Sequence, residues 1–290
     1  MKGLKIVVLA KQVPDTRNVG KDAMKADGTV NRAALPAIFN PEDLNALEQA
    51  LQLKDKFEGS TVHILTMGPG RAAEIIREAM YRGADGGYLL SDRAFAGSDT
   101  LATSYAISCA LKNLTYDVIV CGRQAIDGDT AQVGPQVAEK LGLPQVTYAE
   151  EVQQCDGKKM IIKRRLERGI EVVECPFPCV VTVNGSAAPC RPRNARLVMK
   201  YKYAKAAQES QDADEDYLTL VNERPYLKLT EWSVNDITCE AGELGLNGSP
   251  TKVKNIESVV FQAKESKVLT PADADMDAMM KELITNHTIG

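Results

Sequence analysis

Short apolar runs and longer amphipathic segments alternate along the first half of the chain. Runs rich in leucine and β-branched residues predict strands at residues 4–9, 62–67, 87–90 and 116–121. Between these runs, apolar residues recur at the spacing of one helix face over residues 42–57, 72–81 and 100–111. Strands that alternate with helices form βαβ units, so this half predicts an α/β fold built on a parallel sheet.

The first of these helices has clear start signals. Asn40 is a suitable N-cap, and Pro41 suits the first helical position because it has no amide hydrogen to leave unpaired. Glu42 and Asp43 add negative charge to the first turn, where the helix dipole favours it. The sequence therefore predicts a helix that begins close to Pro41.

After residue 144 the pattern changes to one typical of antiparallel strands. We expect such strands at residues 145–147, 160–166, 170–173 and 179–183, with Asp156-Gly157 as a hairpin turn. From Asn184 onward the pattern weakens, and apolar residues occur in isolated pieces around Trp232 and residues 259–261. We therefore divide the chain into an α/β domain, residues 1–186, and a tail, residues 187–290. The tail is either a poorly ordered linker or an arm that becomes ordered on a partner.

Composition and charge narrow the function classes. The 290 residues are 44% hydrophobic and 26% charged, which is typical of a globular protein. The 35 basic and 39 acidic residues leave a formal net charge of −4, so nucleic acid is not an expected partner. No apolar run reaches the length of about 18 residues that a membrane span needs. The apolar start at residues 6–10 is too short for a signal peptide, so we expect a cytoplasmic protein.

Histidine and cysteine are poorly placed for catalysis or metal binding. The two histidines are His63, inside a predicted strand, and His287, near the end of the chain. The seven cysteines include no Cys-x-x-Cys spacing. We therefore expect buried or unreactive thiols, and neither a disulfide framework nor a metal site.

Two glycine-containing turns are candidates for phosphate binding. The first follows the strand at 62–67 and spells G-x-G-x-x-A from Gly68 to Ala73, with Asp92 at the end of the next predicted strand. This is one form of the dinucleotide-binding fingerprint. The fingerprint usually follows the first strand of a domain, however, and here Pro69 lies inside the turn. A tight strand-to-helix turn without a ligand remains the alternative.

The second candidate is the loop that follows the strand at 116–121. Residues 121–135 are rich in glycine and short polar residues, and they lead into a predicted helix at 131–141. Free backbone amides and the positive end of a helix dipole bind phosphate without a basic side chain. Asp129 or Thr130 could cap this helix, and Arg123 could add positive charge. The alternative is a long, internally hydrogen-bonded loop that holds no nucleotide.

These motifs occur together in one known family. Four stretches resemble the β subunit of electron-transfer flavoprotein: residues 8–15, 40–43, 122–135 and 248–253. Residues 164–167, Glu171 and residues 178–182 look like the signature stretch of that family, from which Arg168 departs. The resemblance covers nearly the whole chain.

The resemblance implies a fold and a set of partners. The fold would be flavodoxin-like or Rossmann-type: a doubly wound, mainly parallel sheet with a small antiparallel extension and an extended C-terminal arm. Residues 1–186 would be the nucleotide-binding domain, and residues 187–290 the arm that clasps an α subunit carrying its own flavin. Acyl-CoA dehydrogenases would be further partners.

The resemblance leaves the cofactor open between AMP and FAD. Ordinary members hold AMP as a structural filler, whereas electron-bifurcating members hold a second FAD that is reduced by NADH. The run from Asp127 to Pro135 is similar to the bifurcating group. A glycine at position 128 lets a pyrophosphate approach the backbone, and Thr130 supplies a hydroxyl for it. The turn from Gly68 to Ala73 would then have a second use, close to the site that receives NADH.

Residue-by-residue matching to the family implies a set of nucleotide contacts. They are Ala10, Asn40, Asp43, Thr66, Met67, Gly122, Arg123, Gln124, Ala125, Ile126, Asp127, Gly128, Asp129, Thr130, Ala131, Gln132, Val133 and Gly134. No catalytic residue is expected, because redox chemistry belongs to the flavin, and the two aspartates of the loop would cap the loop. Leu197 corresponds to the loop that docks acyl-CoA dehydrogenases, although its basic neighbours also fit a solvated arm.

The sequence is therefore consistent with three functions. The first is the β subunit of a bifurcating electron-transfer flavoprotein, which oxidises NADH and divides the electrons between a low-potential carrier, ferredoxin or flavodoxin, and an acyl-CoA dehydrogenase. The second is an ordinary electron carrier whose β subunit holds AMP and has a structural and docking role. The third is a free-standing ATP-binding protein of the same fold.

Overall fold

The computed structural model describes residues 3–15, 36–210, 215–251, 266–286 and 288–289. Its centre is a parallel sheet in which five strands lie in the order β5-β4-β1-β6-β10. These strands are β1 (Lys5–Leu9), β4 (Thr61–Met67), β5 (Gly86–Leu90), β6 (Val118–Gly122) and β10 (Cys179–Val183). A separate antiparallel ribbon joins β2 (Gln12–Pro14) to β3 (Ala37–Phe39).

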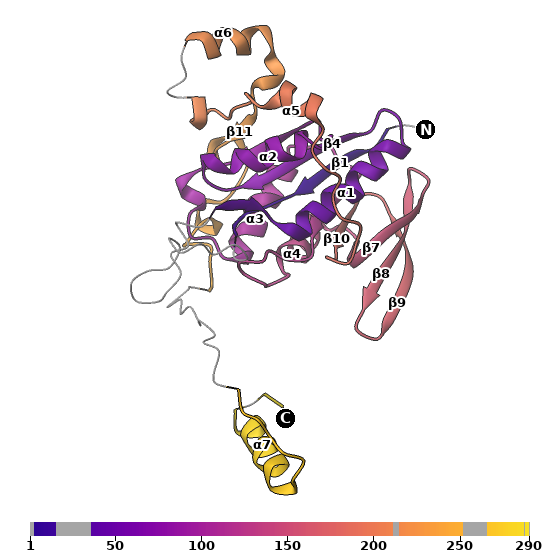
Figure 1. The fold of residues 1–290 in the computed structure, drawn as a ribbon. Coiled ribbons are helices and arrows are strands. Elements are labelled where there is room, and N and C mark those ends of the chain that lie inside the picture. Colours follow the sequence, from indigo (N-terminus) through magenta and orange to yellow (C-terminus); the bar gives the residue numbers. More distant parts are fainter. Residues whose placement is uncertain (1–2, 16–35, 211–214, 252–265, 287, 290) are drawn as a thin grey trace.

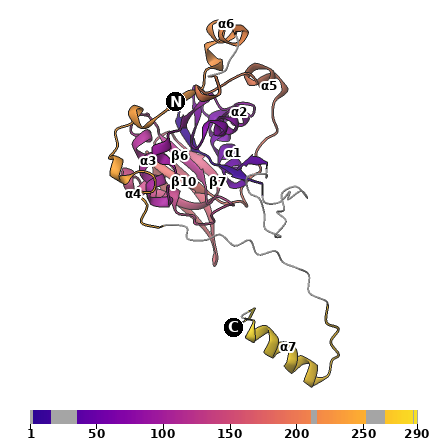
Figure 2. The same ribbon diagram turned by 90° about the vertical axis from the view of Figure 1, so that its left-hand side faces the viewer.

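Helices cover both faces of the parallel sheet (Figure 2). One face carries α1 (Pro41–Lys56) and α2 (Ala73–Met80), and the other carries α3 (Thr100–Leu111) and α4 (Val133–Leu141). Strand β1 shows why. Ile6 and Val8 pack under α1 and α2, whereas Val7 and Leu9 pack under α3 and α4, so the strand is apolar from Ile6 to Leu9. The expected doubly wound α/β fold is confirmed.

The antiparallel extension consists of β7 (Gln145–Cys155), β8 (Lys159–Leu166) and β9 (Gly169–Pro176), and β9 is the outermost strand. The hairpin turn at Asp156-Gly157 is confirmed, because Asp156 accepts the amides of Lys158 and Lys159 while Gly157 has φ 84°. The strand expected at residues 145–147 is not antiparallel there, because Gln145 and Val146 pair parallel with β10 and the antiparallel pairing with β8 begins at Ala149. The expectation that Cys179–Val183 is antiparallel was also wrong. This strand lies between β6 and β7 and pairs parallel with both. All five of its residues are buried, which is typical of a parallel strand covered on both faces.

The segment after residue 186 packs back onto the domain. Its elements are α5 (Ala195–Tyr201), α6 (Glu215–Glu223) and β11 (Thr230–Trp232), and β11 extends the sheet by pairing parallel with β5. Tyr201 and Leu229 belong to the hydrophobic core beside α1 and α2. Short 3-10 helices lie at Gly70–Ala72, Arg93–Phe95, Gln208–Ser210, Pro225–Leu227, Val234–Asp236 and Ala241–Glu243.

The last described helix is α7 (Asp273–Thr285), which buries none of its residues and stands apart from the domain in Figure 1. The apolar piece at residues 259–261 lies outside the described residues. Among the helices of the described ranges, none has the length and apolar character needed to cross a membrane.

A buried carboxylate joins the antiparallel extension to the rest of the domain. Glu150 of β7 is only 8% exposed, and it pairs with Arg165 and Lys163 of β8 and accepts the hydroxyl of Ser186 at 2.6 Å. The hydrogen bonds from Arg165 and Ser186 lower the pKa of Glu150 to about 2. The ionised form is therefore favoured in the folded chain.

We expect Glu150→Gln to lower the free energy of unfolding by about 2 kcal/mol near neutral pH, since it leaves charged partners without their carboxylate. The folded pKa of Glu150 lies below the unfolded value. Its contribution is thus present above the unfolded pKa and is lost as pH falls toward about 2. Urea unfolding at neutral and acidic pH measures this. The control is Glu174→Gln, which breaks an exposed pair with Lys159 and should cost less than about 0.5 kcal/mol. Equal losses of unfolding free energy in the two variants would contradict a stabilising role for the buried carboxylate of Glu150.

Candidate functional site

The sheet has a topological switch point between β1 and β6. From β1 the chain reaches β4 on one side, whereas from β6 it continues through α4 to β7, which lies beyond β10 on the other side. Connections that diverge in this way leave a crevice at the carboxyl ends of the strands, where α/β proteins bind ligands. A cavity of about 520 Å³ lies at this place. Its volume falls within the range of about 300–1,000 Å³ that is usual for small-molecule sites.

The cavity is lined by the ends of β1, β4 and β6, the loop that follows β6, and the segment between β5 and α3. Its lining residues are Leu9, Ala10, Lys11, Asp43, Leu65, Met67, Phe95, Gly97, Ser98, Asp99, Thr100, Thr103, Ile107, Cys121, Gly122, Arg123, Gln124, Ala125, Gly128, Asp129, Thr130, Ala131, Gln132, Val133 and Gly134. Fourteen of the eighteen residues expected to contact a nucleotide are therefore at the cavity; Asn40, Thr66, Ile126 and Asp127 are not.

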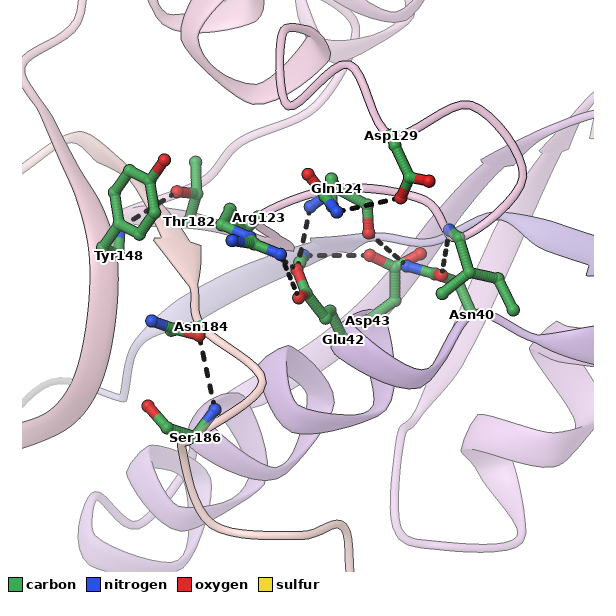
Figure 3. Close-up of polar contacts among 12 residues, drawn as sticks. Asn40, Glu42, Asp43, Arg123, Gln124, Asp129, Tyr148, Thr182, Asn184 and Ser186 are labelled. Atoms are coloured by element: carbon green, nitrogen blue, oxygen red, sulfur yellow. Dashed lines mark hydrogen bonds and ion pairs between the residues drawn. The ribbon is translucent and has the colours of Figure 1, made fainter. Parts of the chain in front are cut away.

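The start of α1, residues 40–43, holds the loop after β6 in place (Figure 3). We call these four residues the α1 corner. Asn40 donates through Nδ2 to the Gln124 carbonyl at 2.9 Å and accepts the Ile126 amide at 3.1 Å. Glu42 accepts the Gln124 amide at 3.0 Å. We expected the side chain of Asn40 to cap its own helix. It makes no capping hydrogen bond, because the loop occupies its amide group.

Asp43 connects the two central strands. Its carboxylate accepts the Gly122 amide at the end of β6 and the Lys11 amide just after β1, both at 2.9 Å. Burial raises the pKa of Asp43 to about 7, although the two amides act in the opposite direction. Burial likewise raises the pKa of the neighbouring Cys121 thiol, which makes it an unsuitable nucleophile.

We expected the loop to present free backbone amides, but several of its amides are already bonded within the protein. The amides of Gly122, Gln124 and Ile126 are bound by the α1 corner, and the Arg123 amide donates to the Val183 carbonyl. The amide of Asp129 turns back to the Ala125 carbonyl. Most backbone amides in the first half of the loop therefore already have hydrogen-bond partners within the protein.

The start of α4 is the part of the loop that can bind an anion. Its N-cap is Gln132, whose side chain makes no capping hydrogen bond. The expectation that Asp129 or Thr130 caps this helix was therefore wrong. Asp129 instead accepts the Gln124 side chain at 2.9 Å. The first amides of a helix have no intrahelical partner. Gln132, Val133 and Gly134 line the cavity, so these amides and the helix dipole are available there.

Two further features of the loop indicate a ligand. Ala131 has φ 52°, a left-handed conformation that costs a residue with a Cβ about 1–2 kcal/mol. Strain of this kind concentrates at ligand sites. Gly128 lines the cavity, and an added Cβ would meet no protein atom within 4 Å. The fold itself therefore gives no reason for a glycine at position 128.

Both basic side chains at the cavity are paired with acids of the same chain. Lys11 contacts Asp127 at 2.8 Å, and Arg123 contacts Glu42 at 3.0 Å. A bound phosphate would consequently depend on backbone amides and the helix dipole more than on unpaired cations.

The side of the cavity formed between β5 and α3 was not predicted from the sequence. Phe95 and Ile107 are apolar there, and together with Leu65 and Met67 they offer a surface that suits a planar ring. Residues 97–100 are polar and approach the start of α4, since the Thr100 hydroxyl donates to the Gln132 side chain at 2.8 Å. This segment leaves the carboxyl end of a parallel strand, which is the one signal that could have identified it.

Three of the other expected positions have different surroundings. Thr66 is buried, and its hydroxyl has no hydrogen-bond partner among the described residues. Leu197 of α5 is partly buried against the core beside α1 and α2, whereas Met199 of the same helix is 64% exposed. Asp127 is held by Lys11 at the edge of the loop.

The turn from Gly68 to Ala73 does not line the cavity. A Cβ at Gly70 would lie 2.8 Å from the Gln208 side chain, which packs over the turn and donates to Ser91. Asp92 accepts the amides of Ala94 and Val234. These contacts favour a tight structural turn over a dinucleotide fingerprint.

Comparisons with known proteins agree with the resemblance. Residues 27–213 match the family model described as electron transfer flavoprotein domain. The chain is 40% identical to an electron transfer flavoprotein subunit beta of Clostridium acetobutylicum, over 99% of this chain and 100% of that protein. It is 42% identical to the caffeyl-CoA reductase-Etf complex subunit CarD of Acetobacterium woodii, over 86% of each chain. It is 53% identical to the acryloyl-CoA reductase electron transfer subunit gamma of Anaerotignum propionicum, over 62% of this chain and 67% of that protein.

Proposed function

Because this chain belongs to the electron-transfer flavoprotein β-subunit family, we propose that its cavity holds FAD and that the subunit oxidises NADH. One electron of each pair passes to a low-potential carrier, ferredoxin or flavodoxin, and the other passes through the flavin of an α subunit to an acyl-CoA dehydrogenase. The FAD would supply the redox chemistry, since a flavin accepts two electrons together and releases them singly. The observation that carries this proposal is the uncapped start of α4 beside Gly128.

The residues at the cavity suit the two chemical parts of a flavin nucleotide. The diphosphate fits the amides of Val133 and Gly134, and Gly128, which also lines the cavity, leaves room for it. The ring system fits the apolar surface formed by Phe95 and Met67. The α1 corner holds the loop in this shape, so Asn40 acts on the ligand through the loop.

The names of two relatives support the proposed partner. One is called a subunit of a caffeyl-CoA reductase complex and the other an electron transfer subunit of an acryloyl-CoA reductase. Both names associate electron transfer with the reduction of a CoA thioester. On this chain, α5 presents Met199 to solvent beside the half-buried Leu197. We propose that this face of α5 docks the dehydrogenase.

A structural role with bound AMP is the second candidate. The start of α4 would hold one phosphate as well as two. The pairing of Lys11 with Asp127 and of Arg123 with Glu42 favours this candidate, because it leaves neither of these two cavity-lining cations free for a second phosphate. In that case the subunit would be a scaffold and a docking surface.

The nucleotide content of the protein separates the two candidates. The chain is copurified with its α subunit, dialysed extensively and denatured with acid, and the released nucleotides are quantified by chromatography. We expect two FAD per heterodimer, no AMP, and reduction of bound flavin on mixing with NADH. One FAD and one AMP per heterodimer, with no reduction by NADH, would contradict the proposal and establish the scaffold role.

A further inference from the structure

One side of the cavity is held by a part of the chain that lies about 150 positions away in sequence. Residues 97–100 line the cavity, and we call them the polar wall. Asp99 of this wall caps α3 by accepting the amides of Leu101 at 2.9 Å and Ala102 at 3.0 Å. Its second carboxylate oxygen accepts the amide of Thr251 at 3.0 Å and the hydroxyl of Thr251 at 2.7 Å.

A second contact fixes the backbone of the same residue. The Ser249 hydroxyl accepts the Asp99 amide at 2.8 Å and donates to the Gly245 carbonyl at 2.6 Å. Ser249 is 5% exposed, so its hydroxyl is largely shielded from water. Residues 245–251, which we call the support segment, thus bind both the amide and the carboxylate of Asp99.

Packing adds a third contact. Gly97 has φ 75°, and a Cβ at this position would lie 2.6 Å from the Leu246 side chain. The polar wall therefore fits closely against the support segment. On the other side of the wall, the Thr100 hydroxyl reaches Gln132 at the start of α4. A continuous set of contacts joins Thr251 to the proposed phosphate site.

From these contacts we infer that the support segment positions the nucleotide site: by holding Asp99 it sets the polar wall, and through Thr100 it sets the start of α4. This inference rests on the proposed function, because it concerns how tightly the cavity holds a nucleotide. Thr251 and Ser249 are positioning residues, since neither lines the cavity. Coupling between two sites is reciprocal, so a nucleotide in the cavity should also stabilise the contacts of the support segment.

The test compares two threonines with the same local chemistry. Thr251→Val removes the hydroxyl that donates to Asp99. Thr270→Val removes an equivalent hydroxyl that donates to Asp275 of α7 at 2.6 Å, outside the cavity lining. Thr251→Ser keeps the hydroxyl and serves as the rescue variant. Each variant is prepared as the full chain in its heterodimer, stripped of nucleotide, and titrated with FAD and with AMP.

We expect Thr251→Val to weaken binding of the retained nucleotide about fivefold, which corresponds to one hydrogen bond of about 1 kcal/mol. Thr270→Val and Thr251→Ser should stay within about twofold of the unmodified protein. If Thr251→Val does not fold, Ser249→Ala takes its place and should weaken binding to a similar extent.

Amide hydrogen exchange gives a readout that a purely structural role would not change. In the unmodified protein, added nucleotide should slow exchange of the Thr251, Leu101 and Ala102 amides, and in Thr251→Val this protection should be reduced. Binding of neither nucleotide to the unmodified protein would overturn the proposed function and this inference together. Normal binding with equal affinity in Thr251→Val, or no protection of the Thr251 amide, would overturn this inference alone.

Discussion

A single methyl group added at Gly122 is expected to lower the free energy of unfolding by about 3 kcal/mol, the upper end of the usual cost of overpacking. The Cβ of Gly122→Ala would lie 2.5 Å from Oδ1 of Asp43 and 2.7 Å from the backbone carbon of Glu42. One of these atoms belongs to the main chain, so the α1 corner as a whole must move away from β6. Asp43 would then lose its bond to the Gly122 amide.

Urea unfolding of the nucleotide-free chain measures this effect. The matched control is Gly128→Ala, the same substitution six positions later in the loop that follows β6, where the added Cβ has no protein neighbour within 4 Å. We expect the control to lie within about 0.5 kcal/mol of the unmodified chain. Similar free energies of unfolding for the two variants would mean that the α1 corner does not pack against Gly122 as closely as described.

The second large effect, on FAD binding, is expected at Gly128, where an added Cβ meets no protein atom within 4 Å. Gly128→Val should leave the stability of the empty protein nearly unchanged and weaken FAD binding about thirtyfold, because the new side chain occupies space proposed for the diphosphate. This estimate corresponds to about 2 kcal/mol of steric cost. Isothermal titration of the stripped heterodimer with FAD measures it.

Gly242→Val is the control for this variant. Gly242 also has no neighbour within 4 Å of an added Cβ, and it does not line the cavity. FAD should bind this control as it binds the unmodified protein. Undiminished FAD affinity in Gly128→Val would mean that the diphosphate does not lie next to Gly128. It would also weaken the case for FAD over AMP.

The sequence predicted the parallel core well, because strands buried on both faces are continuous apolar runs that need no partner to be recognised. The orientation of Cys179–Val183 was not predictable in the same way. A run of five apolar residues indicates burial, but the direction of pairing depends on which strands it lies between, β6 and β7 in this fold. The same limit applies to β11, whose three residues form a strand only because β5 offers an edge.

The candidate site was predictable where local motifs define it and was missed where distant residues do. Loop residues 122–134 were identified from glycine content and from the family resemblance. The side chain of Asn40 was expected to cap its helix, because capping statistics describe local partners, yet its partners are 84 and 86 positions away. Residues 95–107 carry no glycine-rich motif, so their place at the cavity follows only from the position of β5 in the sheet.

The outermost strand of the antiparallel extension has a consequence for handling the isolated protein. Within the described part of the chain, strand β9 pairs on one side only, with β8, and two of its aliphatic side chains, Ile170 and Val172, are 50% and 56% exposed. An open strand edge flanked by aliphatic side chains is a template for another strand. Chains produced without a covering partner should therefore join edge to edge as their concentration rises, and a lysine in place of Val172 should keep them apart.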